Sequence, residues 1–428
     1  MAAGLGARMR SDVPKHLHPI LGRRMVDWVF EAARALGVEP IVVVAAPATA
    51  AEFDGLPVAI QHAPRGTGDA VRAARDALAG RVDDVLVLSG DTPLLTSDVL
   101  RELVERHRTQ AVAATVLSFE PDDPKQYGRV LRNEAGGLAA IVEYRDATDE
   151  QRAVREVNSS IYVFRADRLW PVLDRLTPHN AQGELYLTDS VALLVAGGDR
   201  VGVHKGDDPL VTEGVNTRVE LAAAAAALRD RINQEHMLAG VTIVDPGSTW
   251  IDADVRLDPD AVVHPFTVIR GASHIASRAE IGPHAVIVDA TVGEGALVGP
   301  FCYLRPGTVL EAGAKAGTFV ELKNSRIGER TKVPHLSYLG DADVGADTNV
   351  AAGNITANQE HTRVKERTTI GSNVRTGVDN TFVAPVSIGD DAWIAAGSVI
   401  TEDVPPGALA IARARQLNKE GRGGKRHD

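Results

Sequence analysis

Cysteine, aromatic residues and positive charge are all scarce in this 428-residue sequence. Its single cysteine, Cys302, excludes a disulfide framework. The net charge of −11 at pH 7 argues against nucleic acid as a partner, because polyanions bind basic surfaces. The sequence contains no apolar run of about eighteen residues and no secretory signal pattern. We therefore expect a cytoplasmic protein with no membrane partner, and a chain of this length predicts two or three domains.

Small aliphatic residues take the place of the aromatics, which make up 4% of the chain. In the second half an aliphatic residue recurs at every sixth position from Ile251 to Ile287, and the spacing returns in shifted phase as far as Ile400. This period is typical of a parallel β-helix, in which three short strands form a triangular coil of about eighteen residues. A charged break at 357–369 predicts one loop that leaves the β-helix. The first unbroken run consists of Ile251, Leu257, Val263, Ile269, Ile275, Ile281 and Ile287.

The first half has the pattern of an α/β domain. Short apolar runs alternate with helical patterns over 1–215, which indicates a mostly parallel sheet with ligands at the carboxyl ends of its strands. Glu220–Met237 contains neither Gly nor Pro and predicts a connecting helix. We place the α/β domain at 1–217, the linker helix at 218–240, and the β-helix with its C-terminal tail at 241–428. The α/β pattern rests on Ile41–Val44, Ala70–Leu78, Val85–Leu88, Val99–His107 and Ala111–Leu117.

Two segments of the first half suit phosphate and metal chemistry. Gly4 and Gly6, followed by Arg8 and Lys15, present backbone N–H groups and positive charge to a phosphate. Short Gly-rich turns are also common without any ligand. The apolar run before Asp91 predicts a buried strand that ends at this carboxylate, which is a hard oxygen ligand suited to Mg²⁺.

Two segments of the second half place charged side chains on the β-helix. Arg305 and Lys323 are eighteen residues apart, so they stack one coil apart, at about 4.8 Å, on the same face. Like charges in this position repel, and an anion such as a sugar phosphate lying against them would relieve the repulsion. The alternative is a pair of splayed surface cations. His335 follows twelve residues after Lys323, and a lone histidine is either a structural hydrogen-bonding group or a base.

Longer motifs identify a family. The first half contains seven short motifs. In chain order they are Ala2–Met9 with Pro14-Lys15, Gly66–Gly68, Ser89–Asp91, Tyr127–Arg129, Ile141–Glu143, Val157-Asn158 and Glu213–Asn216. Together they resemble the sugar-nucleotide pyrophosphorylases. With the β-helix and its segment Pro334–Asp341, the whole chain resembles the bifunctional GlmU family.

The resemblance implies a Rossmann-like nucleotidyltransferase domain joined by the linker helix to a left-handed β-helix. It also implies acetyl transfer from acetyl-CoA to glucosamine-1-phosphate, then uridylyl transfer from UTP to N-acetylglucosamine-1-phosphate with release of pyrophosphate. The product is UDP-N-acetylglucosamine, a precursor of cell-wall polymers. Mg²⁺ is the implied cofactor and a homotrimer the implied assembly.

The resemblance also implies a role for individual residues. Ala2, Ala3, Gly4, Gln61, Gly66, Thr67, Ser89 and Gly90 would hold the uridine nucleotide, Lys15 its phosphates, Gly128, Glu143 and Asn158 the sugar, and Asp91 with Asn216 the Mg²⁺. On the β-helix, His335 would be the general base, Arg305, Lys323, Tyr338, Asn349 and Asn358 would contact the amino sugar, and Ala352, Ala396 and Arg413 would contact acetyl-CoA.

The sequence departs from the family pattern at several places. Ala7 stands where the family has Thr, and Gln359 and Val378 replace Tyr and Ser near the coenzyme cleft. The family also places a buried strand of about six residues ahead of Ala2, whereas this sequence begins at Met1. We expect the sheet to lack this strand, which would leave two neighbouring strands without ladder partners and open an apolar gap. We interpret the sequence as an N-terminally truncated form of a longer one.

Two other functions compete with the bifunctional enzyme. In the first, only uridylyl transfer is active and the β-helix is an oligomerisation scaffold; Gln359 and Val378 favour it, whereas the retained His335 and Lys323 do not. The second is a zinc β-helix enzyme of the carbonic-anhydrase type, which requires three convergent histidines. The candidates are His264, His274, His284, His335 and His361, and the first three are ten residues apart, which puts them on different faces.

Overall fold

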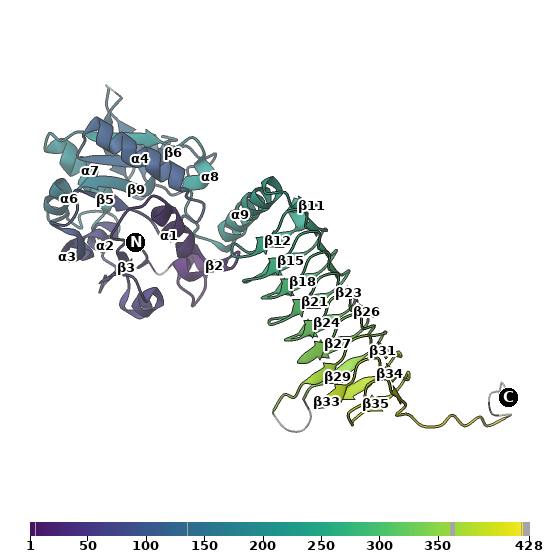
Figure 1. The fold of residues 1–428 in the computed structure, drawn as a ribbon. Helices are drawn as coiled ribbons and strands as arrows, with labels where there is room; N and C mark the ends of the chain where they lie inside the picture. Colours follow the sequence, from purple (N-terminus) through teal and green to yellow (C-terminus); the bar gives the residue numbers. More distant parts are fainter. Residues whose placement is uncertain (5, 135, 360–363, 421, 423–428) are drawn as a thin grey trace, which may run out of the picture. The chain divides into compact units, whose positions relative to one another are not determined.

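The structure is a computed structural model that describes residues 1–4, 6–134, 136–359, 364–420 and 422. The chain forms two compact units, Met1–Leu228 and Arg229–Asp428 (Figure 1). Helix α9 (Arg218–Leu238) crosses the boundary between them. Among the described residues, no helix combines the length and the apolar character needed to cross a bilayer.

The first unit is an α/β fold, as predicted. Its main sheet has the strand order β10-β6-β9-β7-β8, with β5 also paired to β9, and a separate two-stranded sheet joins β3 to β4. The strands are β1 (Pro19–Ile20), β2 (Arg23–Arg24), β3 (Val43–Ala45), β4 (Val58–Ile60), β5 (Asp84–Val87), β6 (Ala114–Phe119), β7 (Arg129–Arg132), β8 (Leu138–Val142), β9 (Val157–Arg165) and β10 (Val201–Lys205). The helices are α1 (Met25–Ala35), α2 (Thr67–Ala73), α3 (Arg75–Leu78), α4 (Ser97–Gln110), α5 (Asp149–Arg152), α6 (Ala166–Leu173), α7 (Leu187–Ala196) and α8 (Pro209–Thr212).

The prediction of a mostly parallel sheet is wrong for the centre of this unit. Strands β3 and β4 are parallel, as are β6 and β10, but β9 runs antiparallel to both β5 and β6. The cause lies in the hairpin of β7 and β8, because the chain crosses to the far side of the sheet after β6, forms this hairpin there, and returns through β9 in the opposite direction. An alternation of apolar runs with helical patterns does not reveal such an excursion.

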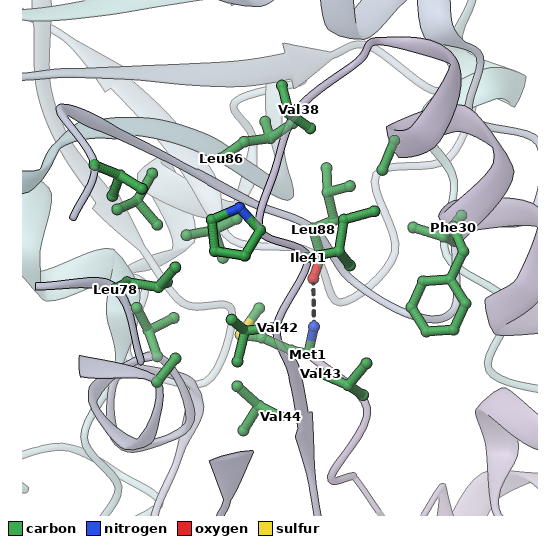
Figure 2. Close-up of a pocket in the computed structure, with 18 of the residues that line it drawn as sticks. Met1, Phe30, Val38, Ile41, Val42, Val43, Val44, Leu78, Leu86 and Leu88 are labelled. Atoms are coloured by element: carbon green, nitrogen blue, oxygen red, sulfur yellow. Dashed lines mark hydrogen bonds between the residues drawn. The ribbon is translucent and has the colours of Figure 1, made fainter. Parts of the chain in front are cut away.

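The sheet of the first unit is divided between β3 and β5. The start of the chain joins the two parts: the Ala2 amide donates to the Val44 carbonyl at 2.7 Å, and the Gly90 amide donates to the Met1 carbonyl at 2.9 Å. Next to this junction lies a cavity of about 180 Å³ with a mainly aliphatic lining from α1, α2, β3 and β5 (Figure 2). The expected apolar gap is therefore present, whereas β3 and β5 each keep one ladder partner, β4 and β9.

The second unit is a left-handed β-helix. Short parallel strands, from β11 (Thr242–Ile243) to β36 (Leu409–Ala410), stack coil upon coil in three long rows that Figure 1 shows as ladders. Paired residues are 18 apart in the first coils, as in Ile251 with Ile269, and 17 apart further on, as in Ile275 with Val292. Between Val344 and Ile370 the step is 26, which places one loop outside the coil where the charged break predicted it.

The six-residue period determines the core of the β-helix. All seven aliphatic residues of the first run are buried, with exposed fractions between 0% and 8%. A ladder of outward-facing aromatic rings marks one corner, where Phe266, His284, Phe301 and Phe319 stack on successive coils with ring centroids 4.8 to 5.4 Å apart. Each of these four residues has a positive φ, the conformation that turns the chain at this corner.

Candidate functional sites

The first site lies at the carboxyl end of β5, where Asp91 follows the strand. Two pockets of about 200 and 500 Å³ open there, and they share four lining residues. Between them they bring together eight of the residues assigned above, although these come from distant parts of the chain. The eight are Gly4, Lys15, Ser89, Asp91, Gly128, Glu143, Asn158 and Asn216, and the shared lining consists of Arg8, Gln126, Glu143 and Asn216.

Lys15, Asp91 and Asn216 form the charged centre of this site. The Lys15 ammonium is paired with the Asp91 carboxylate and donates to the Asn216 side-chain oxygen at 2.9 Å. The Ser89 hydroxyl donates to the other Asp91 oxygen at 2.6 Å, and Arg8 donates to the same Asn216 oxygen at 2.9 Å. Burial alone would raise the pKa of Asp91, but Lys15 and Ser89 hold it below its usual value. Asp91 is therefore an ionised carboxylate.

The oxygen atoms of this centre fit a hard divalent cation. Asp91 and Asn216 both direct a side-chain oxygen at one positive group, the Lys15 ammonium. Mg²⁺ takes one or two such oxygen ligands and completes its shell with water and substrate phosphates. No cluster of three or more His, Cys, Asp or Glu side chains suited to a metal occurs in the described part of the chain, so a dedicated protein cage is not offered here.

Glu143, Gly128 and Asn158 form one wall of the pocket of about 200 Å³. Burial raises the pKa of Glu143, and Thr188 partly opposes the rise by donating to its carboxylate at 3.1 Å. A side chain at position 128 would come within 3.2 Å of Ile141 and 3.5 Å of the Glu143 carboxylate, so glycine keeps this approach open. The buried Asn158 amide donates to the Tyr162 hydroxyl at 2.7 Å. The wall offers a carboxyl and an amide to hydroxyl groups of a ligand.

The remaining residues assigned to the nucleotide lie outside these two pockets. Ala2 and Gly90 take part in the junction between β3 and β5, and Ala3 follows directly after it. Gln61, Gly66 and Thr67 form a second group at the start of α2. The Gln61 amide donates to the Gly66 carbonyl at 3.0 Å, and Thr67 accepts from the Leu187 amide at 2.9 Å.

The second site lies on the β-helix, on the face formed by β21 (Tyr303–Leu304), β24 (Glu321–Lys323) and β27 (Tyr338–Gly340). These strands pair in register, with Leu304 opposite Leu322 and Lys323 opposite Gly340. Arg305 therefore stacks beside Lys323, as predicted. Each cation already has a carboxylate: Arg305 donates to Glu321 at 2.9 Å, and the Lys323 ammonium lies 3.7 Å from Asp341. Neighbouring acids thus reduce the repulsion that the sequence suggested.

Asp341 connects the predicted sugar-binding residues of this face. Its carboxylate accepts from Asn324 at 2.6 Å and from Asn358 at 2.5 Å, in addition to its contact with Lys323. The absence of a side chain at Gly340 leaves room for the Tyr338 hydroxyl and the Asn358 amide, which would both clash with a Cβ there. Lys323, Tyr338 and Asn358 therefore lie close together beside Gly340 and Asp341.

One row of stacked residues runs from His335 along the β-helix axis. The pairing of Lys332 with Asn349 and of Asn349 with Arg375 puts Ala352 beside His335 and Val378 beside Ala352. The pairing of Thr376 with Ile394 extends the row to Ala396. His335 and Val378 are exposed. The predicted base and two residues assigned to acetyl-CoA thus share a row, and the row contains the departure Val378.

Other predictions for the β-helix have mixed outcomes. Asn349 lies in the strand row that leads to His335, whereas Arg413 lies after β36 and is exposed. Glu360 and His361 fall outside the described residues.

The other candidate zinc ligands bind carboxylates or stack separately: His264 contacts Glu280 at 2.8 Å, His274 contacts Asp258 at 3.1 Å, and His284 stacks on Phe266. The carbonic-anhydrase interpretation gains no support from the described residues.

Sequence reasoning missed several residues that line or support the first site. Gln126 lines both pockets, and Tyr127 fixes the backbone before Asn216, because its hydroxyl accepts from the Gly214 amide at 3.1 Å. The position of Tyr127 next to Gly128 was a usable signal. Thr188 contacts Glu143 across 45 positions of sequence, and only the fold brings them together.

Comparisons with known proteins agree with this arrangement. The MobA-like NTP transferase domain matches residues 1–182. The bifunctional protein GlmU of Caldanaerobacter subterraneus subsp. tengcongensis is 45% identical over 441 residues, covering 98% of this chain and 96% of that protein. Those of Mycobacterium bovis and Streptomyces avermitilis are 47% and 48% identical, again over 98% of this chain and over 90% and 92% of their own lengths. The chain therefore belongs to the GlmU family of bifunctional uridylyltransferases and acetyltransferases.

Proposed function

We propose that the pocket of Lys15, Asp91 and Glu143 carries out uridylyl transfer from UTP to N-acetylglucosamine-1-phosphate, and that the face of Lys323 with the row of His335 carries out acetyl transfer from acetyl-CoA to glucosamine-1-phosphate. The observation that carries the proposal is the convergence of eight residues from distant segments on one charged centre. We assign the first activity to 1–217 and the second to 241–428, with 218–240 as linker.

In uridylyl transfer the sugar phosphate oxygen attacks the α-phosphorus of UTP, and the bond from this phosphorus to the bridging oxygen breaks to release pyrophosphate. Such a reaction depends mainly on positioning and charge neutralisation. Mg²⁺ held by Asp91 and Asn216 would supply charge neutralisation at the phosphates. Lys15 and Arg8 bring positive charge to the same place, and Glu143 and Asn158 orient the sugar hydroxyls. Ala2, Ala3, Gly4, Gln61, Gly66, Thr67, Ser89 and Gly90 would hold the nucleotide.

In acetyl transfer the amine nitrogen of the amino sugar attacks the thioester carbonyl carbon of acetyl-CoA. His335 accepts the amine proton as general base, the carbon–sulfur bond breaks, and coenzyme A leaves as the thiolate, which takes up a proton to become the thiol. Arg305, Lys323, Tyr338, Asn349 and Asn358 would position the amino sugar. The row of Ala352, Val378 and Ala396 offers a strip of small and aliphatic side chains for the coenzyme, with Arg413 as a further contact.

The alternative assignment, in which the β-helix is only a scaffold, is favoured by Val378, which puts an apolar side chain in the coenzyme row. The retained His335 and Lys323 oppose it. We further propose a homotrimer, because a three-sided β-helix has flat faces that can pack about a threefold axis. The proposed compartment is the cytoplasm. Light scattering tests the assembly, and a monomer with intact acetyl transfer would contradict it.

Two separate assays of the purified protein test the assignment. Release of pyrophosphate from UTP and N-acetylglucosamine-1-phosphate measures the first reaction, and release of free thiol from acetyl-CoA and glucosamine-1-phosphate measures the second. We expect both reactions. Pyrophosphate release without thiol release at saturating acetyl-CoA would establish the scaffold alternative instead.

A further inference from the structure

Gln61 is a buried side chain at the carboxyl edge of the small sheet, directly after β4. Its backbone amide donates to the Ala45 carbonyl at 2.9 Å, and Ala45 in turn bridges to Ala2 in the Gly-rich segment. Strands β3 and β4 are parallel, so Gln61 lies at the edge of the sheet where ligands of α/β folds bind. Only 7% of the surface of this residue is exposed. Its few accessible atoms therefore have a defined surrounding.

The side-chain amide of Gln61 can take one orientation, because both groups that face its nitrogen are hydrogen-bond acceptors. Nε2 donates to the Gly66 carbonyl at 3.0 Å and to the Asp69 carboxylate at 3.2 Å. A rotated amide would place its oxygen against two other oxygen atoms, neither of which has a proton to donate. The Gln61 oxygen is thus turned away from Gly66 and Asp69, and it has no hydrogen-bond partner among the described residues.

Asp69 stays ionised because two arginines hold its other oxygen. Arg65 donates to Oδ1 at 3.0 Å and Arg72 donates to the same oxygen at 2.8 Å, whereas the Gln61 amide occupies Oδ2. Burial alone would raise the pKa of Asp69, but hydrogen bonds from Gln61, Arg72 and Arg65 hold it below its usual value. The Asp69 side chain is 7% exposed, so water does not compete freely for these contacts. Both of its oxygens therefore act only as acceptors.

We propose that Asp69 is a positioning residue for nucleobase selection, which fixes Gln61 so that a hydrogen-bond acceptor and not a donor faces the base. The inference rests on the function proposed above, in which Gln61 contacts the uridine nucleotide, and it identifies what sets the selectivity of that contact. Uracil and thymine carry a hydrogen on N3, which donates to the Gln61 oxygen. Cytosine has a lone pair on N3, which the same oxygen repels. A site that pairs one base through a buried polar group rejects the analogue that leaves this group unpaired.

The two arginines determine how Gln61 responds to a neutral amide at position 69. In Asp69→Asn, Arg65 and Arg72 retain the oxygen of the new side chain, so its NH₂ group turns toward Gln61. Their two charge-assisted hydrogen bonds outweigh the single neutral bond from Gln61 to the Gly66 carbonyl. Gln61 then rotates, and its own NH₂ group faces the base. The preference should shift from uracil toward cytosine.

Binding of UDP, CDP and N3-methyluridine diphosphate tests the inference by calorimetry, with the full chain and without turnover. We expect the unmodified chain to bind UDP at least tenfold more tightly than either of the other two. In Asp69→Asn the preference for UDP over CDP should fall at least tenfold. This ratio separates selectivity from general damage, which would weaken both nucleotides alike. The ratio of kcat/KM for UTP and CTP should follow the same change.

Two further variants complete the test. Asp76→Asn, at an exposed position on α3, removes the same charge from the same segment and should keep the preference of the unmodified chain. Asp69→Ser replaces the carboxylate by a hydroxyl that can donate or accept, so it should also lower the preference, and it serves if Asp69→Asn does not fold.

The possible failures can be told apart. If both Asp69 variants keep the full preference for UDP, the role of Asp69 is overturned. Equal binding of UDP and N3-methyluridine diphosphate to the unmodified chain overturns the acceptor orientation of Gln61. If the unmodified chain binds none of the three nucleotides, the uridylyltransferase site proposed above is itself contradicted, and the inference falls with it.

Discussion

The two units differ in how completely their apolar cores are packed. In the β-helix, each inward residue of the six-residue period meets its equivalent on the next coil, and exposed fractions at these positions are close to zero. In the first unit a cavity of about 180 Å³ interrupts the sheet between β3 and β5. At about 24 cal/mol per Å³, a dry void of this size costs on the order of 4 kcal/mol. In the β-helix, every coil contributes a similar share of the stability. In the first unit, the stability of the sheet depends on individual strands that no repeat can replace.

The largest expected effects separate the activities of the two units. Asp91→Asn removes the negative charge that is paired with Lys15. We expect uridylyl transfer to fall at least 10²-fold, in the range of a lost transition-state contact. Acetyl transfer should stay unchanged. Pyrophosphate and thiol release report the two activities, and equal loss of both would indicate misfolding instead.

His335→Ala is the converse change. Loss of a general base lowers the rate by about 10²–10⁴-fold. We expect this loss in thiol release alone, with pyrophosphate release unaffected. A matched control is His274→Ala, which changes a half-buried histidine on an earlier coil, outside the row of His335. If both variants lose acetyl transfer equally, His335 has a structural role and not a catalytic one.

Acidification should weaken the first unit. Burial lowers the pKa of His16 to about 4, and it also lowers the pKa of His107 and of His204. The unfolded chain, with a histidine pKa of about 6.5, binds more protons than the folded one, so stability falls as pH drops from about 6.5 to 4. For His16 alone the loss is about 2–3 kcal/mol. Calorimetry at pH 7 and 5 should show a lower melting temperature, and His16→Phe should reduce the shift. An undiminished shift in that variant would exclude His16 as its source.

Enlarging one alanine should have opposite effects in the two units. Ala74→Leu adds methyl groups beside the cavity and should stabilise the first unit by about 0.5–2 kcal/mol. Ala316→Leu, at an inward position of the β-helix with no exposed surface, should destabilise the second unit by about 1–3 kcal/mol through overpacking. Urea unfolding measures both. A destabilising Ala74→Leu would mean that the cavity cannot accept side chains.

The smallest expected effect concerns Val378. Val378→Ser restores one hydroxyl in the row between Ala352 and Ala396, worth about 0.5–1.5 kcal/mol, and should lower the KM for acetyl-CoA about two- to tenfold without changing kcat. Val364→Ser, at another exposed valine, provides the control. A similar gain in both variants would point to general surface effects and not to the coenzyme row.

Much of this molecule was predictable from sequence, for physical reasons that differ between the units. The run from Ile251 to Ile287 is a local repeat, so it determines the coil, its core and the stacking of Arg305 beside Lys323 without any long-range information. The direction of β9 was not predictable, because it depends on how the chain returns from a hairpin. Nor was the contact of Thr188 with Glu143, which the sequence separates by 45 residues. The motifs predicted candidate site residues that the structure brings together, but not the residues that support them, such as Thr188.

The strand pairing of the β-helix determines how far the loss of one coil affects the other coils. Within the described residues, each coil pairs with the coils before and after it, in steps of 16 to 18 residues and of 26 residues across the inserted loop. Such a stack behaves as a one-dimensional series of coupled units, in which loss at one end need not reach the other. Removal of coils from the carboxyl end would shorten the row from Ala396 toward His335. If this row holds coenzyme as proposed, coenzyme binding would weaken in increments while His335, the proposed base, stayed in place. Acetyl transfer should then decline gradually and not all at once.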